Sequence, residues 1–244
     1  MNKLIFTFLL LSIFSHSQNK LNLDYLYPQE DLIIEYQDEW GRNNYKKIIK
    51  EFIKSPLEFG DIVFLGNSIT RGGKDWSKRL NYPNIKNRGI GGDVTDGVLA
   101  RINEITYFKP RAVFLLIGIN DLYNNSPTVP SPEYVGNNIV KIANIIKSKS
   151  PNTEVFVQTT LPINRLKKVG LIKNEIHKKN IRKVNSIIKL NEDNSIYKVI
   201  DLYSAFANDK GFIKSDLSYD GVHLSERGYK IWVDFIKPIV HSLD

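Results

Sequence analysis

Short runs of apolar and β-branched residues recur along the chain and predict buried strands. The first is Asp61 to Leu65 (DIVFL), which ends at Gly66, and similar runs follow at Ala112 to Ile117, Glu154 to Thr159 and Tyr197 to Leu202. Helices cover both faces of a parallel sheet, so its strands are apolar throughout and do not alternate with polar residues. These runs therefore predict a sheet that is buried on both sides.

Between the runs, apolar residues are spaced three and four positions apart, which predicts amphipathic helices. The segments with this spacing are Val94 to Ile105, Tyr134 to Ser148, Ile176 to Leu190 and Ser225 to Ser242. A further helix precedes the first strand and ends at Ser55 and Pro56. Strand and helix thus alternate, which predicts an α/β fold with a mainly parallel sheet and helices on both faces.

The first residues differ from the rest of the chain and predict an export signal. Lys3 is followed by an eleven-residue, mainly apolar run from Leu4 to Phe14, and Ser15-His16-Ser17 has the small-x-small pattern of a cleavage site. Eleven residues are too few to span a bilayer, so we interpret residues 1–17 as a secretory signal peptide. The chain has no cysteine for a disulfide or for lipid attachment. We therefore expect a secreted or periplasmic protein with no stable membrane anchor.

The remaining sequence is typical of one globular domain. Of the 244 residues, 42% are hydrophobic and 25% are charged, which fits a single α/β domain. No internal repeat, low-complexity tract or Gly/Ser linker marks a second domain. We expect residues 18–59 to form an N-terminal extension with a leading helix packed on the domain, and residues 60–244 to form the domain itself.

The chain is basic, with a formal net charge of +8. Much of the excess lies between Lys167 and Lys183, where seven Lys and Arg residues are accompanied by Glu175 alone. Nucleic-acid phosphates could bind such a stretch, but it lacks interleaved aromatic residues and has the spacing of a helix. We interpret it as a solvated helix face and expect no nucleic-acid partner.

Two segments far apart in the chain supply the parts of a nucleophilic triad. Ser68 lies in the segment GNSIT, and Asp220 and His223 lie in the segment DGVH. A separation of three residues lets the carboxylate hold one imidazole nitrogen while the other nitrogen faces the serine. Taken singly, Ser68 could be a helix N-cap, Asp220 a turn residue and His223 a surface histidine. The other three histidines lie in the signal, in the basic stretch and near the end of the chain, so only His223 is placed for catalysis.

Two further clusters follow predicted strands and offer hydrogen-bond donors. Gly92 precedes Asp93, which we expect to be the N-cap of the helix that starts at Val94, so that the Gly92 N–H points outward. Asn120 follows the run that ends at Ile117, although an asparagine there could also be a simple turn residue. Ligands bind beyond the carboxyl ends of parallel strands, and ester hydrolysis needs donors for the developing oxyanion. Gly92 and Asn120 fit that role.

With these residues in place, the sequence resembles the GDSL esterases, also called SGNH hydrolases. Four blocks occur in the order of that family: GNSIT around Ser68, NRGIGGD around Gly92, GIND around Asn120 and DGVH ending at His223. The resemblance implies that Ser68 is the nucleophile, that His223 is general base and then acid, and that Asp220 orients the histidine. It also implies an oxyanion hole made by the N–H groups of Ser68 and Gly92 and the side-chain amide of Asn120.

The resemblance further implies a flavodoxin-like fold, a three-layer α/β/α sandwich around a central sheet of five parallel strands. The GIGGD block and the single-domain layout are similar to the platelet-activating-factor acetylhydrolase catalytic subunits and to exported bacterial esterases, some of them assigned to O-acetyl groups of sialic acid. One position departs from the family pattern, because Asn67 replaces the usual aspartate before the serine. Asparagine keeps the shape and one acceptor of that aspartate but not its charge.

These observations predict a secreted serine esterase that removes a short acyl group, expected to be acetyl, from a carbohydrate such as sialic acid. The alternatives are a phospholipid acetylhydrolase, a lysophospholipase or thioesterase, and a non-catalytic module that binds carbohydrate or nucleic acid. The chain has no HExxH motif and no paired Cys/His spacing, so we expect no metal and no cofactor. The expected partner is a small-molecule or glycan ester. A homodimer is a further expectation, because the acetylhydrolase subunits associate in pairs.

Overall fold

A computed structural model describes residues 23–123 and 128–243, and the predicted signal peptide lies outside these ranges. At its centre is a sheet of five parallel strands in the order β2-β1-β3-β4-β5. The strands are β1 (Ile62–Gly66), β2 (Ile85–Gly89), β3 (Ala112–Leu116), β4 (Glu154–Gln158) and β5 (Lys198–Ile200). The order reverses between β1 and β3, and sheets of this kind bind ligands at that point, beyond the carboxyl ends of the strands.

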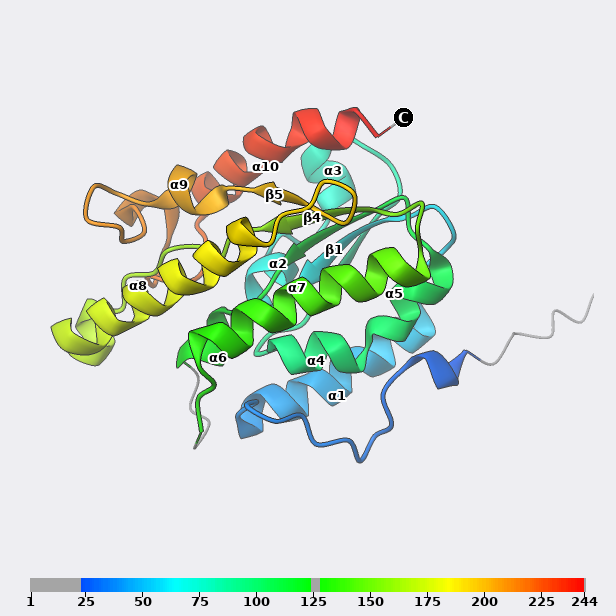
Figure 1. Cartoon of the computed structure of the whole chain (residues 1–244), viewed down its shortest axis with the longest axis horizontal. Coiled ribbons are helices and arrows are strands. Elements are labelled where there is room, and N and C mark those ends of the chain that lie inside the picture. Colours follow the sequence, from blue (N-terminus) through cyan, green and yellow to red (C-terminus); the bar gives the residue numbers. More distant parts are fainter. Residues whose placement is uncertain (1–22, 124–127, 244) are drawn as a thin grey trace, which may run out of the picture.

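Helices cover both faces of the sheet (Figure 1). On one side lie α1 (Glu39–Lys54), α4 (Thr95–Ala100), α5 (Ile102–Phe108), α7 (Pro132–Lys149) and α8 (Leu166–Leu190). On the other side lie α3 (Trp76–Leu80) and α10 (Glu226–His241). The shorter elements are α2 (Ser68–Gly72), α6 (Ile119–Tyr123), α9 (Leu202–Phe206), η1 (Asp24–Leu26) and η2 (Ser215–Leu217).

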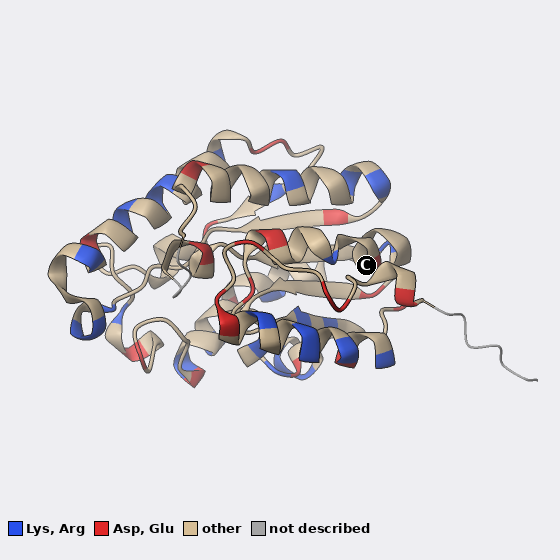
Figure 2. Ribbon diagram, turned by 90° about the horizontal axis from the view of Figure 1, so that it is seen from below, with Lys and Arg blue, Asp and Glu red and all other residues tan. Residues whose placement is uncertain are grey.

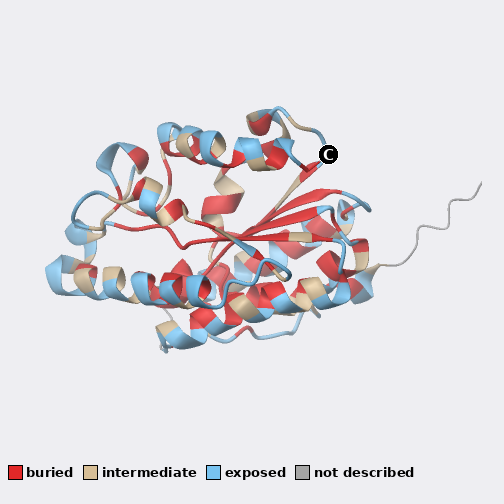
Figure 3. Ribbon diagram, turned by 45° about the horizontal axis from the view of Figure 1, so that its top comes forward, coloured by how far each residue is buried: buried red, intermediate tan, exposed pale blue. Residues whose placement is uncertain are grey.

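A row of aromatic rings forms one layer of the core. Phe64, Phe114 and Phe156 occupy the same register position on β1, β3 and β4, and their ring centroids are 4.9 and 4.7 Å apart. Trp76 of α3 stacks on Phe64 at 4.4 Å, and Trp232 of α10 packs against Trp76, so the row faces α3 and α10. Strands β1 and β3 are buried throughout, and the inward faces of the helices are buried as well (Figure 3). This rigid sheet supports the loops at its carboxyl edge.

The predicted fold class is confirmed, because the structure is a three-layer α/β/α sandwich around five parallel strands. Four strands coincide with the apolar runs. The fifth, β2, has the sequence IKNRG, which hydropathy does not identify as a strand. It is an edge strand whose Lys86 and Asn87 are partly exposed, while Arg88 is buried against Glu104 at 2.8 Å. No further strand covers the outer side of an edge strand, so such a strand can contain polar residues.

Two helices differ from their predicted bounds. The segment from Val94 to Ile105 forms two helices, α4 and α5, which meet at Arg101, where the backbone is not helical (φ −108°, ψ 17°). Helix α8 begins at Leu166, well before the predicted start, and is kinked at Gly170, where φ is 76°. None of the helices within residues 23–123 and 128–243 combines the length and the apolar character needed to cross a bilayer.

Candidate active site

Four loops meet at the carboxyl edge of the sheet, beside the point where the strand order reverses. Ser68 follows β1, Gly92 follows β2 and Asn120 follows β3. The loop before α10 carries Asp220 and His223 to the same edge, where Ser68 and His223 are in contact although 155 positions separate them in the chain. Parallel strands end at one edge, which is why the fold gathers residues from distant segments here.

Ser68, His223 and Asp220 form a continuous series of hydrogen-bonded side chains. Ser68 Oγ lies 3.0 Å from His223 Nε2, and His223 Nδ1 lies 2.8 Å from Asp220 Oδ2. In the tautomer that carries its proton on Nδ1, the imidazole donates to Asp220 and accepts from the Ser68 hydroxyl. The N-cap of α2 is Asn67, so the Ser68 hydroxyl is not used as a helix cap. This geometry allows the serine proton to pass to the imidazole.

The carboxylate of Asp220 is fixed within its own loop. Oδ1 accepts from the backbone N–H groups of Val222 and His223 at 2.9 and 2.8 Å, which leaves Oδ2 for the imidazole. Burial, the largest single influence, acts to raise the pKa of Asp220, but hydrogen bonds from the His223 ring and from the two backbone N–H groups outweigh it and lower the pKa. Asp220 is therefore ionised at neutral pH and can stabilise an imidazolium at His223.

Neighbouring contacts hold the histidine loop in place. Ser218 Oγ donates to the His223 carbonyl at 2.7 Å and accepts from the Gly221 N–H at 2.9 Å. The Asn164 N–H donates to the Gly221 carbonyl at 2.8 Å, which ties the loop to the segment after β4. The ring of Tyr219 lies parallel to the imidazole, with ring centroids 5.9 Å apart. The His223 side chain is positioned by these contacts and stays 34% exposed, so a substrate can reach it.

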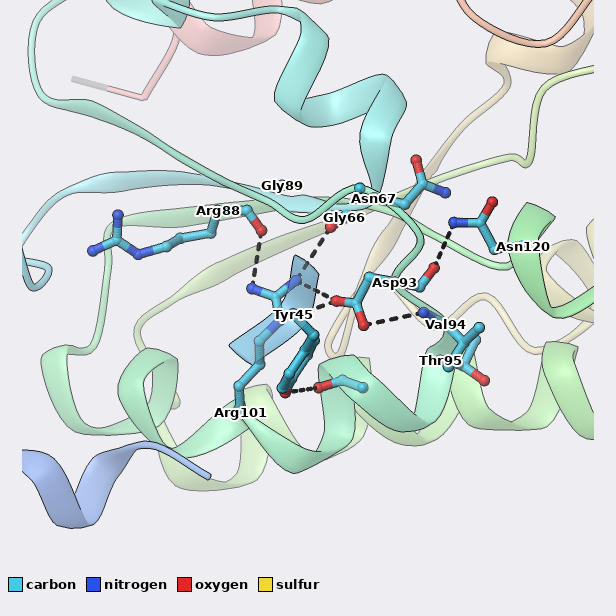
Figure 4. A network of polar contacts seen from close by, with 12 residues as sticks. Tyr45, Gly66, Asn67, Arg88, Gly89, Asp93, Val94, Thr95, Arg101 and Asn120 are labelled. Atoms are coloured by element: carbon cyan, nitrogen blue, oxygen red, sulfur yellow. Dashed lines mark hydrogen bonds and ion pairs between the residues drawn. The ribbon is translucent and has the colours of Figure 1, made fainter. Parts of the chain in front are cut away.

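The two expected oxyanion donors are brought together by one hydrogen bond. The side-chain amide of Asn120 donates to the carbonyl of Asp93 at 2.8 Å (Figure 4), which places Asn120 beside the loop that contains Gly92. An amide NH₂ group has two hydrogens, and this bond uses one of them. Gly92 has a φ of 79°, and a Cβ there would lie 2.8 Å from the Cα of Gly41, so this position requires glycine.

The prediction that Asp93 caps the following helix is wrong. The N-cap of α4 is Val94, and the first turn is held by Asp121, whose Oδ1 accepts from the Thr95 N–H and hydroxyl at 3.0 and 2.6 Å. Asp93 forms a buried ion pair with Arg101, with 2.8 Å between the nitrogen and the oxygen. A carboxylate that is fully removed from water needs a cation, and the sequence did not indicate that Arg101 would turn inward to supply one.

Arg101 connects the site to the ends of two strands (Figure 4). Its guanidinium donates twice to Asp93 Oδ2 and once each to the carbonyls of Arg88 and Gly66, on β2 and β1. The side chains of Arg101 and Asp93 are 3% and 0% exposed. Burial raises the pKa of Asp93 to about 6, and the guanidinium acts in the opposite direction. Since the Asp93 carbonyl holds Asn120, this ion pair positions a residue of the site.

The N-terminal extension supports the same loop. Gln37 Nε2 donates to Asp93 Oδ1 at 3.1 Å, and Asn44 Nδ2 donates to the carbonyl of Gly91 at 2.8 Å. Both residues lie outside the four sequence blocks, and no pattern in the sequence singles them out. The loop that carries Gly92 is therefore braced by residues that sequence reasoning missed.

Asn67 caps helix α2, as the usual aspartate at this position could. Its Oδ1 accepts from the Ile69 N–H at 3.0 Å and so begins α2, as a carboxylate would. Its Nδ2 is buried and has no hydrogen-bond partner. The replacement thus preserves the position of Ser68 at the start of the helix.

The other described histidines lie away from this cluster. His177 packs against the ring of Tyr123, with centroids 5.9 Å apart, and burial lowers its pKa. His241 contacts a backbone carbonyl through Nε2. His16 is outside the described residues. In the part of the chain that the structure describes, no three His, Cys, Asp or Glu side chains are grouped as ligands of a metal ion would be.

Comparisons with known sequences point to one family. Residues 64–231 match the sequence model of the GDSL-like lipase/acylhydrolase family. The GDSL esterase/lipase WDL1 of Oryza sativa subsp. japonica is 29% identical over 154 residues, which are 56% of this chain and 55% of that protein. The chain thus spans about half the length of this curated relative.

Solved structures share the fold. A GDSL-like lipase from Bacteroides thetaiotaomicron superposes with a TM-score of 0.65 at 21% identity, over 82% of this chain and 98% of that chain. The acetyl xylan esterase AlAXEase superposes with a TM-score of 0.60 at 21% identity, over 74% of this chain and 99% of that chain. At such identities the likeness shows the fold alone.

Proposed function

This chain belongs to the GDSL-like lipase/acylhydrolase family, and we propose that it is a serine esterase that removes short acyl groups, above all acetyl, from carbohydrates such as sialic acid. Family membership makes the chain a carboxylic ester hydrolase. The observation that carries the serine mechanism is the hydrogen-bonded series of Ser68, His223 and Asp220, with separations of 3.0 and 2.8 Å.

Acylation would begin at Ser68. His223 Nε2 accepts the hydroxyl proton while Ser68 Oγ forms a bond to the ester carbonyl carbon. The carbonyl oxygen becomes the oxyanion of a tetrahedral intermediate, and it accepts from the N–H groups of Ser68 and Gly92 and from the second amide hydrogen of Asn120. His223 then donates its proton to the alcohol oxygen as the bond between that oxygen and the carbonyl carbon breaks. The alcohol leaves and the acyl group stays on Ser68.

Deacylation would reverse these roles. His223 accepts a proton from a water molecule whose oxygen bonds to the acyl carbon, and the same donors stabilise the second oxyanion. As the intermediate collapses, His223 returns the proton to Ser68 Oγ and the carboxylic acid is released. Asp220 remains ionised throughout and holds the imidazole in the productive tautomer.

The fold and one sequence block support a short acyl group on a carbohydrate. The fold is shared with an acetyl xylan esterase, and the GIGGD block resembles that of exported esterases, some of them assigned to O-acetyl groups of sialic acid. We also expect the domain of residues 60–244 to lack an insertion that extends an acyl pocket. Export through the signal in residues 1–17 would place the enzyme in the periplasm or outside the cell.

The direct test is hydrolysis of p-nitrophenyl acetate by the purified protein and by Ser68→Ala. We expect the variant to lose nearly all of the activity, because the nucleophile is removed. Ser148→Ala is the matched control, since Ser148 is an exposed serine of α7. Equal rates for Ser68→Ala and the parent would rule out the serine mechanism.

A series of p-nitrophenyl esters from acetate to palmitate tests the acyl preference. We expect kcat/KM to fall as the chain grows. A preference for chains beyond about eight carbons would contradict the proposal, because each buried CH₂ contributes about 0.8 kcal/mol only where an apolar pocket receives it.

A further inference from the structure

A cavity of about 490 Å³ adjoins the histidine loop. Residues 164–168, at the start of α8, line one side of it, and Ser218 to Gly221 line another. The hydrogen bond from the Asn164 N–H to the Gly221 carbonyl joins these two segments. Two of the lining residues contact the catalytic histidine. The Asp220 carboxylate holds the His223 ring, and the Tyr219 ring stacks on it.

The cavity is lined by cations that have no ion-pair partner. These are Arg165, Lys167 and Lys168, and none of them forms a salt bridge within residues 23–123 and 128–243. By contrast, Lys178 of α8 pairs with Glu175 at 2.6 Å. Figure 2 shows Lys and Arg residues recurring along α8 to the end that projects at the left of the view. Three unpaired cations against one lining carboxylate, Asp220, leave the cavity positively charged, and such a cavity attracts an anion.

The chemistry decides which part of an ester reaches this cavity. His223 must donate its proton to the leaving alcohol oxygen, so the alcohol part of the ester lies beside the imidazole. The carbonyl oxygen is directed instead to Gly92 and Asn120. Tyr219 is 72% exposed, and its ring offers an apolar surface next to the imidazole for the ring of a sugar. The alcohol part is thus the part that extends toward the cations.

We propose that this cavity is a subsite for an anionic group, a carboxylate or a phosphate, on the alcohol part of the ester, an inference that rests on the proposed esterase function. Lys167 and Lys168 can pair with such a group. The Arg165 guanidinium lies 4.5 Å over the Tyr123 ring and donates one N–H to the Tyr123 carbonyl at 3.5 Å, and its other N–H groups add hydrogen bonds and positive charge. The subsite selects acidic sugars over neutral ones. Its contribution is electrostatic and is therefore reduced by salt.

The test compares pairs of acetyl esters in which one member carries an anionic group and the other does not. One pair is O-acetyl sialic acid and its methyl ester, and the other is an acetylated glucose with and without a 6-phosphate. We expect the charged member of at least one pair to have a kcat/KM about tenfold higher at low ionic strength, and this ratio to fall as salt is added. The pair with the larger ratio identifies the anion as carboxylate or phosphate. Ratios near one for both pairs would overturn the subsite.

Substitution of the lysines that line the cavity tests whether they cause the preference for the charged substrate. Lys167→Gln/Lys168→Gln should reduce the ratio of charged to neutral substrate severalfold, and a general loss of activity cancels in this ratio. Lys54→Gln/Lys149→Gln makes the same change of charge at exposed helix ends on the opposite edge of the sheet and should leave the ratio unchanged. An unchanged ratio in the first variant, or an equal fall in both, would overturn the assignment. Absence of p-nitrophenyl acetate hydrolysis in the parent would instead refute the esterase function, so the two failures are distinct.

Discussion

Replacement of Arg101 by methionine tests whether the buried ion pair stabilises the protein and its site. Methionine is similar in length but uncharged, so it removes the four hydrogen bonds that the guanidinium donates to Asp93, Arg88 and Gly66. Removing one partner of a buried pair costs about 3–5 kcal/mol, because the other charge is left without compensation. In a protein of this size each kcal/mol corresponds to roughly 2–4 °C in Tm.

The loss of stability should also depend on pH. Burial already raises the pKa of Asp93 to about 6 while Arg101 acts against it, so removal of the guanidinium raises this pKa further. The folded variant then binds a proton that the unfolded chain has lost above about pH 4, and its stability falls as pH rises. The difference in the free energy of unfolding between parent and variant should therefore be larger at pH 8 than at pH 5.

Urea unfolding followed by tryptophan fluorescence at both pH values measures these effects. Arg71→Met is the matched control, because Arg71 also pairs with a carboxylate, Glu51, at 3.0 Å, but the two side chains are 40% and 48% exposed. Such a surface pair contributes about 0–1 kcal/mol. Equal losses of stability in the two variants, or a loss in Arg101→Met that does not change with pH, would show that the Arg101–Asp93 pair does not stabilise the fold in this way.

Two further predictions concern neighbouring residues. Asn120→Ala should lower kcat by about 10² or more with a smaller change in KM, because the amide acts on the oxyanion; an effect on KM alone would remove Asn120 from that role. Asp121→Asn removes a carboxyl whose pKa burial raises to about 7, against hydrogen bonds from Thr95 that lower it. The folded parent holds this proton between about pH 4 and pH 7 and loses stability as pH rises through that range. Relative to the parent, the free energy of unfolding of the variant in urea should thus be about 2–3 kcal/mol higher at pH 8 than at pH 5. Parallel pH profiles of the two proteins would contradict this.

Apolar runs located four of the five strands. β1, β3 and β4 lie inside the sheet, where neighbouring strands and helices remove them from water, and β5 lies within an apolar run at one edge although Lys198 is exposed. β2 lies at an edge, and its arginine is buried only through its partner Glu104, so its sequence carries no apolar run. The missed strand reflects tertiary contacts that no local pattern encodes.

The candidate site likewise contains residues that the sequence identifies and residues that only the fold reveals. Ser68, Gly92, Asn120 and His223 lie in short contiguous blocks, so the sequence alone identifies them. The supporting contacts join segments far apart in the chain, as Gln37 does with Asp93. Its local sequence predicts Asp93 to be a helix cap, but a buried carboxylate pairs with a nearby cation, and only the fold shows that this cation is Arg101.

The proposed mechanism requires an acyl intermediate at Ser68, and trapping that intermediate is the strongest test of it. The protein is mixed rapidly with p-nitrophenyl acetate, quenched in acid, and digested for mass analysis of its peptides. We predict one acetyl group on the peptide that contains Ser68, formed together with a burst of p-nitrophenol, and neither signal in Ser68→Ala. Steady hydrolysis without acylation, or an acetyl group whose appearance with the burst maps to another residue, would contradict the account.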